Sequence, residues 1–178
     1  PGTHGMIEAV RSGKIGEPVF FTSTFGFQSQ LGNHRLHANH WGGALPDVGV
    51  YCLNAARHVF AAEPIAVQAM ASRPAADPRF AEIDASLAVT LRFPGDRLAQ
   101  FFCSFGSGPS ESIRIIGSSG ELILDPAFKF DSALRLTVRT EEAEAVVPFD
   151  QVDHFSGQIA YFSDCILTDT PPEADGEE

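Results

Sequence analysis

The feature that most constrains the fold is the long run of short apolar segments after Glu63-Pro64. They are rich in β-branched and aromatic residues and are separated by turn sequences such as "PGDRL" and "GSSGE", which is typical of strands joined by tight connections. Because short connections join antiparallel neighbours, these segments predict one broad, mostly antiparallel sheet. The expected strands are 65–73, 84–93, 97–105, 111–117, 120–125, 133–140 and 144–149.

Other segments predict one more strand and the helices. "VFFTSTFGFQ" has strand composition, whereas "THGMIEAVRSG" and "FSGQIAYFSDCILT" carry apolar residues at helical spacing. Residues 44–60 predict a further helix, with Pro46 tolerated in its first turn. The fold class is therefore α+β, with one large mixed sheet and helices on one face. Phe20, Phe101, Phe102 and Phe105 exceed what one face needs, so we expect a partner subunit to cover the other face.

Charge and composition exclude several classes of partner. The chain has 12 basic and 23 acidic residues, a net charge of −11, which argues against nucleic acid and anionic lipid surfaces. The acidic groups at 141–144 and 173–178 are expected to be solvated. No apolar run is long enough to span a membrane. Three separated cysteines in apolar contexts predict buried thiols in a reducing compartment, so we expect a cytoplasmic protein.

The stretch "WGGALPDVGVYCLNAARHVF" holds the candidate chemistry. On a helix Asp47 and Tyr51 lie one turn apart on one face, and Asn54 continues that face. A phenol needs a nearby cation to act as an acid or base at neutral pH, and the local sequence offers none. Gly42 and Gly43 allow the backbone to approach a ligand at a helix N-terminus. The alternative is structural: Asp47 favoured by the helix dipole, and Tyr51 an ordinary half-buried aromatic.

A histidine repeat precedes this helix. His34, His37 and His40 recur every three residues, a spacing that on a helix could gather imidazoles around zinc. The stretch also contains Gly32, Asn33 and Asn39, which favour an irregular loop. We therefore expect a structural or solvent-exposed loop there and predict no metal site.

Four stretches together resemble one protein family. "GGALPDVGVYCLNAARHVFAAEP" is similar to the G-G-x-L-x-D-x-G-x-[YH] segment of the glucose–fructose oxidoreductase, inositol dehydrogenase and rhizopine-catabolism (Gfo/Idh/MocA) family. "IEAVRSGKIGEPVFFTSTF" looks like the family's passage from its nucleotide domain into the sheet. "IRIIGSSGELILDPAF" resembles its G-x-x-G-x-[LI] hairpin, and "FSGQIAYFSDCILTDTPPEADGEE" its final helix and the turn beyond it.

The resemblance implies that only the second of two family domains is present. Residues 1–16 would be the tail of the nucleotide domain or a linker helix, and 17–178 the substrate and oligomerisation domain, ending before the last helix. The Rossmann domain itself is absent: "FGSGPSE" lacks the G-x-G-x-x-G pattern and its strand–helix setting. The family's Lys-Pro lysine, which would supply the missing cation, is absent as well.

The resemblance also implies a reaction: hydride transfer between NAD or NADP and a sugar or polyol carbinol. Tyr51 would exchange the hydroxyl proton and Asp47 would orient the hydroxyl or the lysine, with Arg35, His40, Trp41 and Asn54 contacting substrate. Gly42 and Gly43 would make a minor cofactor contact, because the absent domain holds most of the cofactor. We expect a homodimer or homotetramer formed through the sheet, and no activity from this chain alone. The alternatives are a non-catalytic oligomerisation scaffold and a reductase of the dihydrodiol or biliverdin type.

Overall fold

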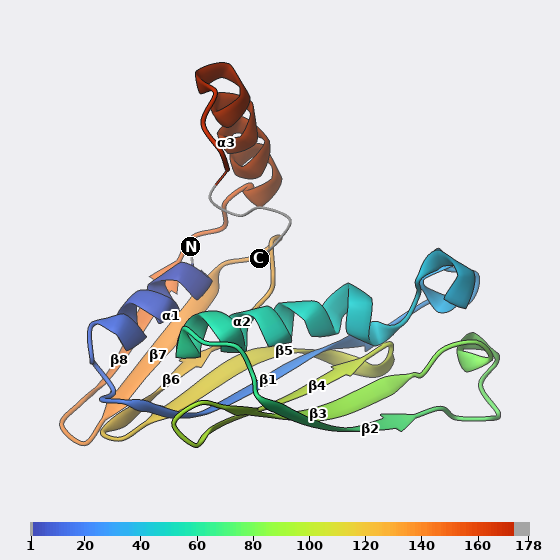
Figure 1. Ribbon diagram of the computed structural model, residues 1–178, viewed down its shortest axis with the longest axis horizontal. Helices are drawn as coiled ribbons and strands as arrows, with labels where there is room; N and C mark the ends of the chain where they lie inside the picture. Colours follow the sequence, from blue (N-terminus) through green and yellow to red (C-terminus); the bar gives the residue numbers. More distant parts are fainter. Residues whose placement is uncertain (1, 173–178) are drawn as a thin grey trace.

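The computed structural model describes residues 2–172, and the acidic end at 173–178 lies outside them. Eight strands form one sheet in the order β2-β3-β4-β1-β5-β6-β7-β8 (Figure 1). The strands are β1 Pro18–Gln28, β2 Ala66–Ser72, β3 Ser86–Phe93, β4 Arg97–Ser104, β5 Gly106–Gly117, β6 Gly120–Leu124, β7 Leu134–Thr140 and β8 Glu144–Phe149. The predicted α+β class with one large mixed sheet is confirmed.

Two details of the sheet differ from the simplest expectation for hairpins. The first strand in the sequence, β1, inserts between β4 and β5, and its pairing with β4 is parallel while every other pairing is antiparallel. β5 starts at Gly106 rather than at 111, because its first residues continue the ladder to Gln28 of β1. β1 therefore occupies the middle of the sheet, where it contacts both halves.

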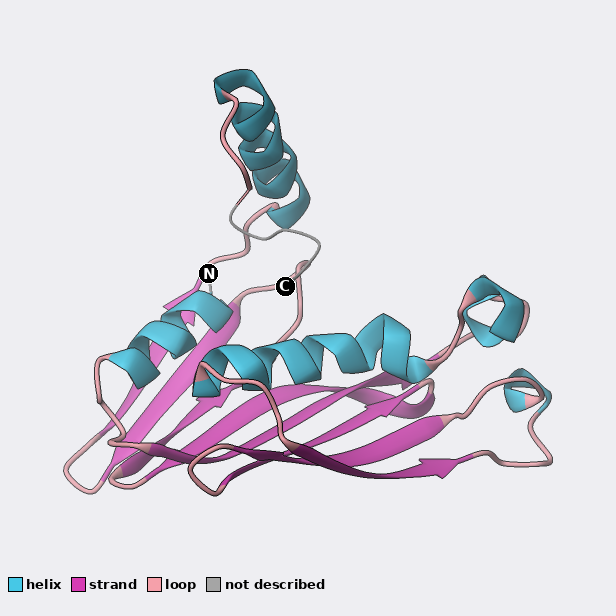
Figure 2. Ribbon diagram, in the orientation of Figure 1, coloured by secondary structure: helices cyan, strands magenta, loops and turns pink. Residues whose placement is uncertain are grey.

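The helices divide into two that cover the sheet and one that does not. α1 (Gly2–Arg11) and α2 (Val50–Phe60) lie along the same face of the sheet (Figure 2). α3 (His154–Thr168) follows β8 and projects away from the sheet, and Cys165 is its one buried residue. Short helical turns at His34–Leu36, Ala38–His40 and Leu45–Gly49 connect β1 to α2.

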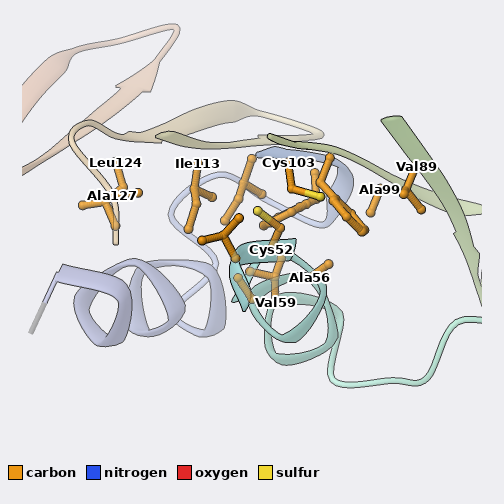
Figure 3. Close-up of a cluster of buried hydrophobic side chains, with 14 of the residues drawn as sticks. Cys52, Ala56, Val59, Val89, Ala99, Cys103, Ile113, Leu124 and Ala127 are labelled. Atoms are coloured by element: carbon orange, nitrogen blue, oxygen red, sulfur yellow. The ribbon is translucent and has the colours of Figure 1, made fainter. Parts of the chain in front are cut away.

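The core lies between α1, α2 and the sheet face beneath them. Figure 3 shows Cys52, Ala56 and Val59 of α2 pointing at the sheet, where they meet side chains such as Cys103 and Ile113. Strand residues at every second position supply the sheet side of this layer, as the pleat requires. The fully or almost fully buried residues on this side include Phe21, Phe101, Cys103, Ile113, Ile115, Leu122 and Leu124 of the strands and Phe105 between β4 and β5. Phe101 and Phe105 are thus accounted for by one face.

Among residues 2–172, no helix covers the opposite face of the sheet. Phe20 and Phe102 are half-buried there, and every residue of β2 is exposed, including Met70, which lies in the same cross-strand row as Ala88 and Phe102. A hollow of about 400 Å³ on β1–β4 has Thr22, Thr90 and Gln100 among its lining residues. The expectation that a partner subunit covers this face stays a prediction.

The three cysteines are free and buried, as the sequence predicts. Burial raises the pKa of Cys52 to about 11, and burial together with the neighbouring Cys52 raises the pKa of Cys103 to about 12. Thiols with such pKa values carry almost no thiolate at neutral pH, so these two are packing residues rather than nucleophiles. Among residues 2–172 no helix is long and apolar enough to cross a membrane.

Candidate functional site

The candidate site begins with a widened helical turn. Leu45–Gly49 forms a π turn, in which the Val50 N–H donates to the Leu45 carbonyl five residues back, and α2 continues from it. The predicted helix over 44–60 is therefore present, with an irregular first turn. Such turns occur often at functional sites, because they shift the side chains of one turn relative to the next. Here Asp47 lies within the π turn, and Tyr51 lies just beyond it.

Asp47 has a cationic partner that the local sequence did not reveal. The Arg35 Nε donates a hydrogen bond to Asp47 Oδ1 at 2.9 Å, and both side chains are partly exposed. Arg35 sits on the His34–Leu36 turn, whose start is capped by Asn33 Oδ1 accepting from the Arg35 N–H. Arg35 thus gives Asp47 a cationic partner, whereas the cation that the phenol of Tyr51 needs stays a prediction, assigned by the resemblance to the family's lysine. A loop residue twelve positions before Asp47 reaches it across the turn.

Tyr51 lies beside two phenylalanines. Its ring centroid is 5.8 Å from that of Phe25 on β1 and 6.1 Å from that of Phe128, which follows β6. Phe25 and Phe128 themselves stack with parallel rings 4.9 Å apart, and the Tyr51 ring is inclined by 57–58° to both. Tyr51 is 55% exposed, so it is neither a core residue nor isolated on the surface.

The double glycine packs against the chain itself. The Gly42 N–H donates to the His37 carbonyl and the Gly43 N–H to the Arg35 carbonyl, at 3.0 and 2.9 Å. A Cβ added at Gly42 would lie 2.4 Å from the Arg35 oxygen, so only glycine fits there. The glycines thus fold the loop onto the helix start, and their N–H groups are already used within the chain. That leaves the proposed cofactor contact of Gly42 and Gly43 without a free backbone donor.

The histidine stretch forms turns rather than a ligand set. His37 Nδ1 lies 3.1 Å from Glu82 Oε1, and Glu82 Oε2 accepts from the Ala38 N–H at 3.0 Å. The His40 ring meets His37 edge to face at 6.0 Å, and Trp41, in a left-handed backbone conformation, is 85% exposed. Within the described part of the chain, no group of three or more His, Cys, Asp or Glu residues is placed to hold a metal ion.

Asn54 is engaged one turn beyond Tyr51. Its Oδ1 accepts from Arg57 Nη1 at 3.0 Å, and Arg57 also donates from Nε to Glu63 at 2.9 Å. Asn54 is exposed, so its amide nitrogen is the group left to meet a ligand.

Sequence reasoning missed Phe25, Phe128 and the pair Glu111–Lys129 beside them. Phe25 was assigned only to a strand, and Phe128 and Lys129 fall in the irregular "DPAFKFD". Glu111 is directly opposite Phe25 in the β1–β5 ladder, and Lys129 Nζ is 3.4 Å from Glu111 Oε2. Local spacing carries no signal for such contacts, because the three segments meet only in the folded sheet.

Comparison with known proteins assigns the family. Residues 4–123 match the GFO/IDH/MocA C-terminal domain. The chain therefore belongs to the GFO/IDH/MocA family of oxidoreductases and carries its C-terminal domain.

Three relatives illustrate what the chain is similar to. It is 31% identical to D-xylose 1-dehydrogenase [NADP(+)] of Haloarcula marismortui over 99% of this chain and 51% of the relative. It is 29% identical to trans-1,2-dihydrobenzene-1,2-diol dehydrogenase of Bos taurus, over 80% of this chain and 42% of the relative. Aldose-aldose oxidoreductase from Caulobacter crescentus superposes with a TM-score of 0.89 at 30% identity, over 98% of this chain and 53% of that one. The chain spans about half the length of these relatives.

Proposed function

We propose that this chain is the substrate-binding half of an NAD(P)-dependent oxidoreductase that transfers hydride between nicotinamide and a sugar or polyol carbinol. The observation that carries the proposal is the helix start that places Asp47, bound to Arg35, one turn from the exposed phenol of Tyr51. The nearby relatives that act on aldoses support it. In this proposal the nucleotide-binding domain belongs to the same polypeptide, residues 1–16 lead from it, and 17–178 form the substrate domain.

Each side chain of the candidate site is assigned a role that follows from its chemistry. Removal of hydride from a carbinol leaves a hydroxyl proton to be accepted, and Tyr51 is the group we assign to that transfer. Asp47 orients the substrate hydroxyl, and Arg35 holds the Asp47 carboxylate in place from one side. His40, Trp41 and the amide of Asn54 are exposed on the loop and helix that flank this pair in the sequence, and we assign them to the remaining hydroxyls. The bound nicotinamide, NAD or NADP, would supply the hydride acceptor.

The test uses the complete polypeptide with its nucleotide-binding domain. With NAD or NADP and a panel of aldoses and polyols, reduced-nicotinamide absorbance reports turnover. We expect Tyr51→Phe to lower kcat by about 10²–10⁴, the usual contribution of proton transfer, with a smaller change in KM. The matched control is the second tyrosine, Tyr161→Phe on α3, which we expect to leave both unchanged. An unchanged kcat in Tyr51→Phe removes Tyr51 from the mechanism.

A second candidate substrate class is a cyclic dihydrodiol. The similarity to trans-1,2-dihydrobenzene-1,2-diol dehydrogenase and the aromatic rings beside Tyr51 favour it. Including such a diol in the same panel separates the two. If the protein binds nicotinamide but oxidises no member of the panel, its substrate belongs to another class. If it binds no nicotinamide, the alternative of a non-catalytic oligomerisation scaffold is favoured.

We further propose that two or four copies associate through the open face of the sheet and that the protein is cytoplasmic. Phe20, Phe102 and Met70 give that face an apolar component, while Thr22, Thr90 and Gln100 supply hydrogen-bonding groups. Met70→Asp, on β2, is expected to shift the protein to monomer in sedimentation velocity. Retention of the wild-type oligomer would place the interface elsewhere.

A further inference from the structure

We propose that Phe25, Phe128 and Tyr51 form an aromatic corner that selects a ring-form substrate, by stacking on the C–H face of a closed aldose ring. The inference rests on the proposed function and names the form of substrate that its site takes. It assigns a role to Phe128 and to the β6–β7 connection (125–133), which sequence reasoning had left without one.

Two of the three rings stack on each other, and the third is inclined to both. Phe128 lies parallel to Phe25, with an interplanar angle of 2°, and the two rings form a double layer on the helix-covered side of β1. The Tyr51 ring stands inclined to this layer by 57–58°. The Tyr51 ring therefore lies beside the two phenyl rings. Asp47, which binds Arg35 of the His34–Leu36 turn, lies in the π turn that leads into the helix of Tyr51.

The two neighbours of Phe128 in the chain fix its position against β5. The Ala127 N–H donates to the Glu111 carbonyl at 2.8 Å, and Ala127 itself is fully buried. Lys129 Nζ lies 3.4 Å from Glu111 Oε2, an oxygen that is buried and has no hydrogen-bond partner within the described residues. Phe128 is therefore held between two attachments to β5, which places its ring before a substrate arrives.

The chemistry of the corner favours a closed ring. An aromatic face carries negative quadrupole charge and attracts polarised C–H groups, and flat apolar surface is best covered by a flat partner. A closed aldose ring presents several C–H groups on one face and hydroxyls around its edge. Those hydroxyls could meet Asp47 and Tyr51 while the face lies on Phe128. An acyclic polyol with the same hydroxyls has no such face and must also lose more conformational freedom on binding.

The experiment compares Phe128→Leu with Phe130→Leu in the complete polypeptide. Phe130 belongs to the same connection and is 58% exposed, but its ring meets Phe155 of α3 at 5.6 Å instead of Tyr51. D-xylose and its open-chain counterpart xylitol are the probes, followed by nicotinamide absorbance for turnover and by titration calorimetry for binding. Leucine keeps the site apolar, and thermal unfolding of each variant verifies that it folds.

We expect Phe128→Leu to raise KM and the dissociation constant for D-xylose about tenfold, with kcat within about twofold, as for binding lost equally in ground and transition states. Phe130→Leu should change neither, and the wild type should bind xylitol more weakly than D-xylose. Equal effects of the two variants, or equal binding of the two probes, would overturn the inference while leaving hydride transfer intact.

A different outcome would overturn the proposed function without overturning the aromatic corner. If the wild type binds D-xylose, and Phe128→Leu weakens that binding, but no hydride is transferred, the aromatic corner stands and the reaction does not. If neither probe binds at all, both proposals fall.

Discussion

Helices α2 and α3 carry similar amounts of apolar sequence and use it in opposite ways. α2 has 11 residues, of which Cys52, Ala55, Ala56, Val59 and Phe60 are buried against the sheet. α3 has 15 residues and buries Cys165 alone, leaving exposed a set of large apolar side chains: Phe155, Ile159, Phe162, Ile166 and Leu167. Apolar periodicity therefore predicts that a helix has a face to bury, but not whether this chain supplies the surface that receives it.

The largest expected difference between the two helices is in their contribution to stability. Phe60 is 3% exposed, its ring lies 4.8 Å from that of Phe93, and the Arg97 guanidinium lies 5.0 Å above it. Phe60→Ala should lower the free energy of unfolding of this chain by about 3–5 kcal/mol, because it removes a buried ring and leaves a cavity.

Urea unfolding measures this loss, with Phe162→Ala in α3 as the control. Phe162 is 53% exposed, and we expect a change of about 0.5 kcal/mol or less. Similar losses in the two variants would mean that α3 is packed as firmly as α2 in solution.

A glycine in the π turn that leads into α2 gives the second prediction. A Cβ at Gly49 would lie 2.9 Å from Leu45 Cδ1 and 3.0 Å from Cys103 Sγ. Gly49→Ala should therefore lower the free energy of unfolding by about 1–3 kcal/mol, the usual cost of overpacking. In a Cys103→Ala background the second clash is removed, so the same substitution should cost less. An unchanged cost in that background would show that the strain lies elsewhere.

The contrast between the helices also marks what sequence could predict. Alternation and turn residues predicted the strands, and helical spacing predicted the helix that carries Asp47 and Tyr51, because both signals are local. The parallel β1–β4 pairing, the reach of Arg35 to Asp47 and the stacking of Phe128 on Phe25 depend on segments that meet only after folding. No local pattern encodes them. The direction of α3 is of the same kind, since its sequence resembles that of a covering helix.

The capping residue of α3 should respond to acid, whereas α2 has no side-chain cap that could do so. The Ser156 hydroxyl and N–H both donate to the Asp153 carboxylate, and these hydrogen bonds, the one from the hydroxyl first, hold the pKa of Asp153 below its ordinary value. A pKa that is depressed in the folded state means that the cap stabilises the helix above the unfolded pKa and is lost as pH falls through the folded one. Below about pH 4, amide protection in the first turn of α3 should therefore decrease.

Hydrogen exchange with residue resolution measures this response. Gly49, which precedes α2, provides no side-chain cap, so α2 has no capping hydrogen bond to lose in acid. Asp153→Asn keeps an acceptor at the cap but cannot titrate over this range, and it should abolish the acid response of α3. Persistence of that response in the asparagine variant would assign it to another group.

The smallest expected effect is a stabilisation, and it comes from Gly157 of α3. Gly157 lies inside α3, and a Cβ added there would meet nothing within 4 Å. Since glycine costs a helix about 0.5–1 kcal/mol relative to alanine, Gly157→Ala should raise the local stability of α3 by that amount. Native-state hydrogen exchange should show slower opening of α3 with an unchanged urea midpoint for the sheet, because a helix that buries one side chain opens without the core. A shift of the midpoint itself would mean that α3 and the sheet unfold together.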